Sequence, residues 1–175
     1  MKQRFLSLVL IAVFLSALFC GCSKSSDNGS NNKEYLGDYS YSAPAVCMVY
    51  EPVEGETDDN GDPFYGIQYR EITDLNGFLA SGNTLLLYFY SSMDNRGAEI
   101  TAAVEDLAQI YNGRLSVLML DAVEYKELLE KYGINAVPEF VLIKSGQSDS
   151  IFGSTSYDYW TMSDVVLWLK GSGIN

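Results

Sequence analysis

The chain has 175 residues, 47% hydrophobic and 19% charged, which suits one packed domain and excludes a wholly disordered chain. Acidic residues outnumber basic residues by 23 to 11, and the net charge of −12 argues against nucleic acid as a partner, because phosphate contacts need clustered Lys and Arg. The chain contains no histidine, which excludes imidazole general bases, Ser–His and Cys–His nucleophile pairs, and metal sites built on imidazole.

The N-terminus has the pattern of a targeting segment. A short positive region precedes the apolar run 5–19, which is shorter than the roughly 20 residues of a membrane-spanning helix. The run ends in Phe-Cys-Gly-Cys-Ser, which resembles a bacterial lipobox with Gly21 in the small position before the lipidated cysteine. Cys20 fits the acceptor position less well, because a bulky residue precedes it. We therefore expect residues 1–21 to be a lipoprotein signal peptide and Cys22 to carry the lipid.

This interpretation places the chain at a membrane of the bacterial cell envelope, facing outside the cytoplasm, because acyl chains bury their methylene groups in the bilayer. A plain secretory signal and an uncleaved anchor are the alternatives.

Three regions are expected after the signal peptide. Residues 22–40 are predicted to be a flexible tether, because Ser, Asn, Gly and Asp dominate and little apolar surface is available for packing. Residues 41–65 are predicted to be an N-terminal extension, in which Ala45–Tyr50 has the composition of an extra strand. The main domain is then expected at residues 66–175.

The extension carries a cluster of acidic residues. Six of the twelve residues from 51 to 62 are Asp or Glu. The run Asp-Asp-Asn-Gly-Asp at 58–62 resembles a calcium loop only in part, since it lacks the alternating ligands and the terminal Glu of an EF-hand. A solvated hairpin loop with an Asn-Gly turn is the favoured interpretation, and cation binding is the alternative.

From residue 66 onward, apolar runs alternate with helical periodicities, which predicts an α/β domain. The expected strands are 66–70, 84–90, 115–120, 140–143 and 150–152. Helices are expected from Thr73-Asp74 to Gly82, across the segment with Ile100, Val104, Leu107, Ala108 and Tyr111, from Glu124 to Tyr132, and after a capping box at Thr161 and Asp164. This order predicts a mixed sheet with helices on both faces.

The order of elements resembles the thioredoxin fold from about residue 67 to 171. Its most specific part is the segment 131–146, KYGINAVPEFVLIKSG, which is similar to the thioredoxin sequence around the cis-proline. The segment 81–90 is similar to the central strand of the same family. The resemblance implies a three-layer α/β/α domain with a mixed central sheet, and a cis peptide bond between Val137 and Pro138.

The chain departs from this family at its reactive motif. Where thioredoxins carry Cys-x-x-Cys at the start of the long helix, this sequence reads Asp94-Asn95-Arg96-Gly97. Thiol–disulfide exchange needs one thiolate that attacks sulfur and a second that resolves the mixed disulfide. The family's buried Asp in the central strand is also replaced, by Tyr88 or its neighbours. We therefore predict a redox-inactive domain that is not an enzyme.

The resemblance also implies a binding function. In thioredoxins the backbone beside the cis-proline pairs with an extended substrate, and that groove does not require the cysteines. The residues that correspond to its rim in this chain are Ser92, Met93, Asp94, Val137 and Pro138, with Ser154 on a following loop. We therefore expect a module that binds a peptide or protein partner by strand addition and uses no cofactor and no metal. For Asp94, capping of the helix amides is the alternative role.

Two other functions remain open, a monothiol activity at Cys47 and a structural spacer without a ligand groove. Cys47 lies in an apolar strand pattern without a positive neighbour to stabilise a thiolate, which favours a small buried side chain. The tyrosines that flank the domain are candidates for a partner surface or for half-buried packing. These are Tyr35, Tyr39, Tyr41, Tyr157 and Tyr159.

Overall fold

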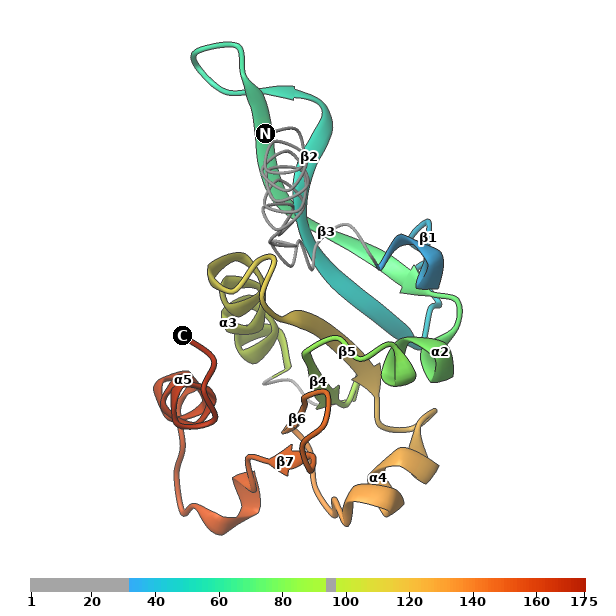
Figure 1. The fold of residues 1–175 in the computed structure, drawn as a ribbon, viewed down its shortest axis with the longest axis vertical. Helices are drawn as coiled ribbons and strands as arrows, with labels where there is room; N and C mark the ends of the chain where they lie inside the picture. The colour runs from blue at the N-terminus through green and yellow to red at the C-terminus, as the bar shows by residue number, and fades with distance from the viewer. Residues whose placement is uncertain (1–31, 94–96) are drawn as a thin grey trace, which may run out of the picture.

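The computed structural model describes residues 32–93 and 97–175 (Figure 1). The predicted signal peptide, Cys22 and Asp94–Arg96 therefore lie outside the described residues. The strands are β1 (Leu36–Gly37), β2 (Ala45–Thr57), β3 (Pro63–Ile72), β4 (Leu85–Tyr90), β5 (Ser116–Asp121), β6 (Glu139–Ile143) and β7 (Ser150–Ile151). The helices are α2 (Leu75–Ala80), α3 (Gly97–Ile110), α4 (Lys126–Tyr132) and α5 (Met162–Gly171), with 3₁₀ turns η1 (Lys33–Tyr35) and η2 (Ser154–Ser156).

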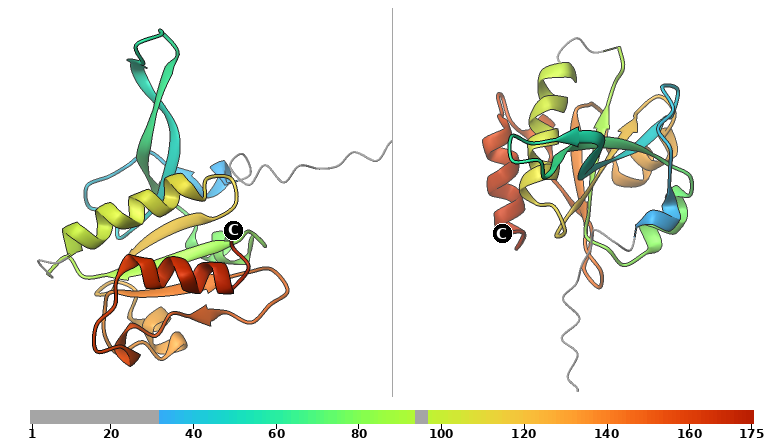
Figure 2. Two further views of the ribbon diagram at one scale, coloured as in Figure 1. Left: turned by 90° about the vertical axis from the view of Figure 1, so that its left-hand side faces the viewer. Right: turned by 90° about the horizontal axis from the view of Figure 1, so that it is seen from above.

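Within the described residues the strands form one mixed sheet in the order β1-β3-β2-β5-β4-β6-β7. Helices α3 and α5 lie on one side of the sheet, and α2 and α4 lie on the other (Figures 1 and 2). The expected three-layer arrangement is therefore confirmed. No helix in this part of the chain has the length and apolar character needed to cross a bilayer.

Strand β4 lies at the centre of the domain. It pairs in parallel with β5 and antiparallel with β6, and its residues Leu85–Phe89 are completely buried. Leu86 and Tyr88 belong to the apolar cluster that contains residues of α3 and α5, whereas Leu87 and Phe89 belong to the cluster on the side of α2 and α4. A strand that is buried on both faces needs apolar residues at every position, which explains the continuous run in the sequence.

Three of the predicted helix ends, at Asp74, Gly133 and Thr161, are confirmed by the structure. Helix α5 begins with a capping box, in which the Thr161 backbone N–H donates to Asp164 Oδ2 at 2.8 Å. This bond, together with one from the Thr161 hydroxyl, lowers the pKa of Asp164. At the start of α2, the Gly77 N–H donates to Asp74 Oδ1 at 2.9 Å. Helix α4 ends at Gly133, whose φ of 67° lies in the left-handed region that glycine adopts without steric cost.

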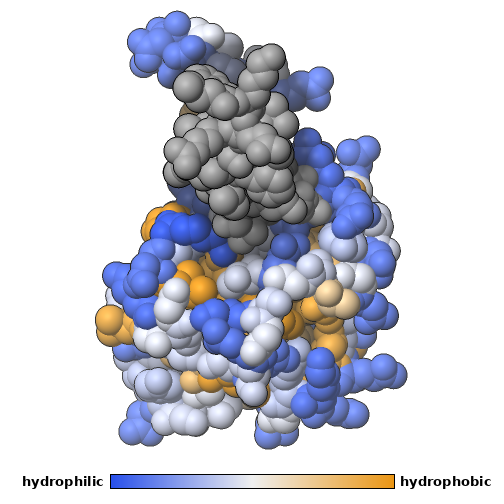
Figure 3. All heavy atoms as spheres, in the orientation of Figure 1, coloured by the Kyte–Doolittle hydropathy of each residue, from blue (hydrophilic) through white to orange (hydrophobic). Residues whose placement is uncertain are grey.

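The extra strand expected at 45–50 is the first part of β2, and it lies inside the sheet. Ala45–Met48 pair antiparallel with β5, and Val46–Pro52 pair antiparallel with β3 on the other side. The boundary that the sequence places after residue 65 therefore falls within a continuous strand, β3. Beyond the sheet, β2 and β3 continue as a projecting hairpin whose far end is hydrophilic (Figures 2 and 3).

Residues 51–57 of the acidic segment belong to β2, and residues 58–62 form the turn of this hairpin, as the favoured interpretation predicts. The N–H groups of Asn60 and Asp62 donate to Asp58 Oδ1 at 2.8 and 3.0 Å. These bonds lower the pKa of Asp58, because they stabilise its charged form. Among the described residues, no group of three or more His, Cys, Asp or Glu side chains is arranged to hold a metal ion.

Residues 32–37, which the composition assigns to the tether 22–40, are part of the folded domain. The Asn32 side chain is buried, and its Nδ2 donates to Ser116 Oγ at 2.8 Å. Its Oδ1 accepts from Asn83 Nδ2 at 2.7 Å. The polar composition misled the prediction here, because a buried polar side chain is stable when hydrogen bonds to distant residues replace its contacts with water.

Candidate functional site

Most of the predicted rim residues meet at the edge of the sheet where β4 ends. Strands β4 and β6 are antiparallel, with Phe89 opposite Glu139. Because of this register, Ser92–Met93, which follow β4, lie at the same edge as Val137–Pro138, which precede β6. We call this part of the molecule the binding edge. Asp94 lies outside the described residues.

The binding edge combines free backbone with an exposed apolar side chain. The Val137–Pro138 peptide bond is cis, as the resemblance implies. Pairing of β6 begins at Glu139, and within the described chain no hydrogen bond engages the backbone N–H or carbonyl of Val137. The Val137 side chain packs against the apolar cluster under α2 and α4, whereas the Met93 side chain is 83% exposed. Such an edge is able to pair with an extended segment of another chain.

Ser154 lies in the interior instead of on the rim, which corrects the expectation from the resemblance. Its backbone N–H and its hydroxyl donate to Glu139 Oε2 at 2.8 and 3.1 Å. Because the side chain is buried and its hydroxyl is engaged, Ser154 holds another residue in place and is not available to a partner.

Glu139 is an important polar residue that was not predicted from the sequence. Its side chain is 3% exposed, and it directly follows Pro138 at the start of β6. Besides the two bonds from Ser154, the carboxylate accepts from the N–H groups of Phe140 and Gly153 at 2.9 and 3.1 Å. A buried carboxylate is tolerated when several donors replace its hydration. The signal in the sequence is an acid within an otherwise apolar strand, EFVLI.

A loop of the N-terminal extension also reaches the binding edge. The Asp121 N–H, at the end of β5, donates to the carbonyl of Pro44 at 2.9 Å. Burial and the Asp121 carboxylate raise the pKa of Tyr90, and Tyr39 adds a smaller contribution of the same sign. Tyr39 packs on Tyr41 with their ring centres 6.2 Å apart, and Tyr41 is 96% exposed. The extension therefore places aromatic surface beside the edge.

The other flanking tyrosines have different roles. Tyr35 stacks on Phe78, with ring centres 5.1 Å apart, and Tyr157 stacks on Phe152 at the same distance. Tyr159 is 82% exposed. Tyr35 therefore has the predicted packing role, whereas the exposed Tyr41 and Tyr159 remain candidates for a partner surface.

The Cys47 thiol is buried in β2 and is 2% exposed. Burial, with a smaller contribution from the Glu51 carboxylate, raises the pKa of Cys47 to about 12. A thiolate is therefore strongly disfavoured near neutral pH, and the thiol has the character of a small apolar side chain.

Comparison with known proteins agrees with this fold. The sequence model of the family described as Thioredoxin matches residues 71–159. The chain is 26% identical over 94 residues to Thioredoxin-T of Drosophila melanogaster, covering 54% of this chain and 60% of that protein. It is 28% identical over 68 residues to Thioredoxin-1 of the same organism, covering 39% of this chain and 64% of that protein. The chain thus spans less than two thirds of the length of these relatives.

Solved structures with a similar fold include two thioredoxin domains. The germline-specific thioredoxin Deadhead (Thioredoxin-1) of Drosophila melanogaster has a TM-score of 0.41 and 20% identity, covering 55% of this chain and 85% of that chain. The first thioredoxin domain of mouse Protein disulfide-isomerase A4 has a TM-score of 0.45 and 22% identity, covering 55% and 67%. Because the family model matches half of the sequence, this chain belongs to the thioredoxin family.

Proposed function

We propose that this chain is a redox-inactive thioredoxin-family module that binds an extended peptide segment of a partner protein at the binding edge. The observation that supports this proposal most directly is the free backbone of Val137 beside the exposed Met93 side chain. Main-chain hydrogen bonds to Val137 would supply affinity for many sequences, and contact with Met93 would favour apolar side chains in the partner.

We infer that the domain is redox-inactive because it lacks the accessible thiols that dithiol exchange needs. After Cys22, the sequence contains one cysteine, Cys47, and none in the segment 91–97 that precedes and begins α3. Dithiol exchange needs two accessible thiols, at least one with a low pKa. Cys47 is buried, and its pKa is raised to about 12, so it meets neither requirement.

We expect the protein to reduce insulin disulfides no faster than dithiothreitol does without protein. The reason is that no described thiol is available to attack the insulin disulfide. A turbidity assay with a redox-active thioredoxin as the positive control measures this. Turnover that disappears in a Cys47→Ala variant would instead show monothiol activity at Cys47.

Peptide binding is tested by site-specific photo-crosslinking in cells that express the full chain. A photoreactive amino acid at Met93 is expected to capture discrete partner proteins. The same amino acid at Leu167, on the outer face of α5, is the matched control because Leu167 is also apolar and 65% exposed. Capture at Met93 and not at Leu167 supports the proposal that the binding edge binds a partner. No capture at Met93, or equal capture at both positions, contradicts it and leaves the spacer function.

We further propose that Cys22 carries a lipid that holds the module at a membrane of the bacterial cell envelope. The support is the positive N-terminus, the apolar run 5–19 and the Gly21-Cys22 pair in the sequence. The binding edge would then act on partners that are exposed at that membrane surface.

A further inference from the structure

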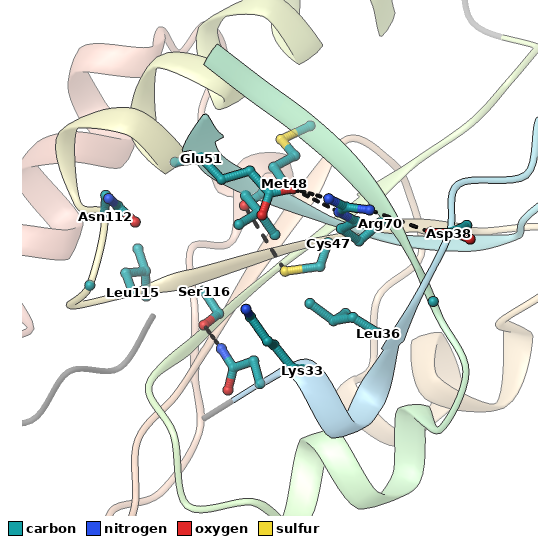
Figure 4. Close-up of a pocket in the computed structure, with 15 residues that line it drawn as sticks. Lys33, Leu36, Asp38, Cys47, Met48, Glu51, Arg70, Asn112, Leu115 and Ser116 are labelled. Carbon is teal, nitrogen blue, oxygen red and sulfur yellow. Dashed lines mark hydrogen bonds and ion pairs between the residues drawn. The ribbon is translucent and has the colours of Figure 1, made fainter. Parts of the chain in front are cut away.

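A cavity of about 430 Å³ lies where β2 separates from β5 (Figure 4). Pairing between these strands ends at Met48, opposite Val117, whereas β2 continues along β3 beyond this point. The segment around η1 and β1, together with the turn between α3 and β5, closes the space that is left. The volume lies in the range of small-molecule sites, about 300–1,000 Å³.

Lys33 supplies a positive charge to this cavity. Its side chain runs between Ser116 and Leu36, and its nitrogen points toward the middle of the lining residues (Figure 4). No carboxylate of the described residues lies within ion-pair distance of the Lys33 ammonium. The Arg70 guanidinium, by contrast, is already paired, since its Nε donates to Glu51 Oε1 at 2.7 Å. Lys33 is therefore the cation that a ligand can use.

Ser116 adds a hydrogen-bond donor beside Lys33. The residue is 9% exposed, and its hydroxyl oxygen accepts from Asn32 Nδ2 at 2.8 Å. Within the described part of the chain no acceptor receives the Ser116 hydroxyl proton, so the hydroxyl is able to donate to a ligand. An ammonium and a hydroxyl donor together match the two oxygens of a carboxylate.

The rest of the lining combines six apolar side chains with polar ones, and its two carboxylates, Asp38 and Glu51, both pair with Arg70. The apolar side chains that line the cavity are Leu36, Cys47, Met48, Val49, Ala108 and Leu115. These side chains favour a ligand with an aliphatic body, because the burial of methylene groups against them removes apolar surface from water.

We propose that this cavity binds an aliphatic monocarboxylate, with the carboxylate between Lys33 and Ser116 and the chain against the apolar wall. The site is distinct from the binding edge, because Ser116 begins β5 and Asp121, beside the binding edge, ends it. Most of its lining precedes the segment 71–159 that the family model matches, so the site depends on residues upstream of the family segment.

The test measures the binding of decanoate to the full chain by isothermal titration calorimetry. Wild-type protein is expected to bind decanoate saturably, and to bind decanol at least roughly tenfold more weakly, because the alcohol lacks the charge that pairs with Lys33. Lys33→Met is expected to weaken decanoate binding by a similar factor and to abolish the preference over decanol. Lys126→Met, at the exposed start of α4, removes the same charge elsewhere and should leave both affinities unchanged.

A second variant, Val49→Trp, fills the cavity and is expected to prevent saturable binding, with circular dichroism as the check that it folds. If Val49→Trp does not fold, the comparison of Lys33→Met with Lys126→Met decides the question. Absence of saturable binding to the wild-type chain, equal effects of the two lysine variants, or undiminished binding by folded Val49→Trp would each overturn the proposal. None of these three outcomes would bear on the proposal that the binding edge binds a peptide.

Discussion

Replacement of Glu139 by alanine is expected to lower the free energy of unfolding by about 3 kcal/mol. The carboxylate accepts four hydrogen bonds, from the N–H groups of Phe140, Gly153 and Ser154 and from the Ser154 hydroxyl. Without it, these donors remain in a buried region with few other acceptors, and an unsatisfied buried donor costs about 1–3 kcal/mol. Water that enters the space left by the side chain would hydrogen-bond to some of these donors, which limits the total loss of stability.

Urea denaturation monitored by tryptophan fluorescence measures this effect. The matched control is Glu130→Ala on the exposed surface of α4, for which we expect a change within about 0.5 kcal/mol. Glu139→Gln keeps one acceptor oxygen but turns an N–H₂ group toward the donors, so its stability should lie between those of the wild type and Glu139→Ala. A Glu139→Ala variant as stable as the Glu130→Ala control would show that the four bonds do not stabilise the fold.

Replacement of Cys22 by serine is expected to transfer the protein from the membrane fraction to the soluble fraction of bacterial cells. The proposed anchor requires a sulfur that accepts the lipid, and serine does not supply one. One acyl chain gives marginal, reversible attachment, whereas two or more hold a protein stably on a bilayer. The expected change is therefore nearly complete and is visible by immunoblotting after ultracentrifugation.

Cys20→Ser is the matched control, because it changes the other cysteine of the same Cys-Gly-Cys sequence and should leave the protein in the membrane fraction. Release by Cys20→Ser in place of Cys22→Ser would move the acceptor to Cys20. Retention of both variants in the membrane would favour an uncleaved anchor formed by residues 5–19.

Local sequence patterns predicted much of the domain. The apolar run of β4 indicated burial on both faces, and Leu85–Phe89 are buried. The Thr161-x-x-Asp164 pattern predicted a capping box, which the hydrogen bonds of α5 confirm. These features depend on neighbours within a few residues, so a single sequence carries the information. The binding edge came from resemblance, because the register of β4 against β6 joins residues fifty or more positions apart.

The features that were missed depend on contacts between distant segments. Ser154 was expected on the rim, but its interior position is set by Glu139, which lies 15 residues earlier. The segment that contains Asn32 has the polar composition of a tether, but the hydrogen-bond partners of the Asn32 side chain lie 51 and 84 residues away in the sequence. The cavity likewise forms from segments whose approach is decided by where β2 leaves β5. Composition and periodicity describe an element and its faces, and they do not specify which elements become neighbours.

The interior position of β2 also determines whether the segment that matches the family model is able to fold on its own. A fragment that begins at residue 71, where the family match begins, lacks β2 and nearly all of β3. The outer side of β5 would then present the unpaired N–H and carbonyl groups along Val117–Leu120 to solvent, next to completely buried side chains that have lost their cover. An open, apolar strand edge of this kind promotes self-association. In this chain the N-terminal hairpin is therefore an integral part of the sheet, and we expect a stable fragment to begin upstream of the segment that the family model matches.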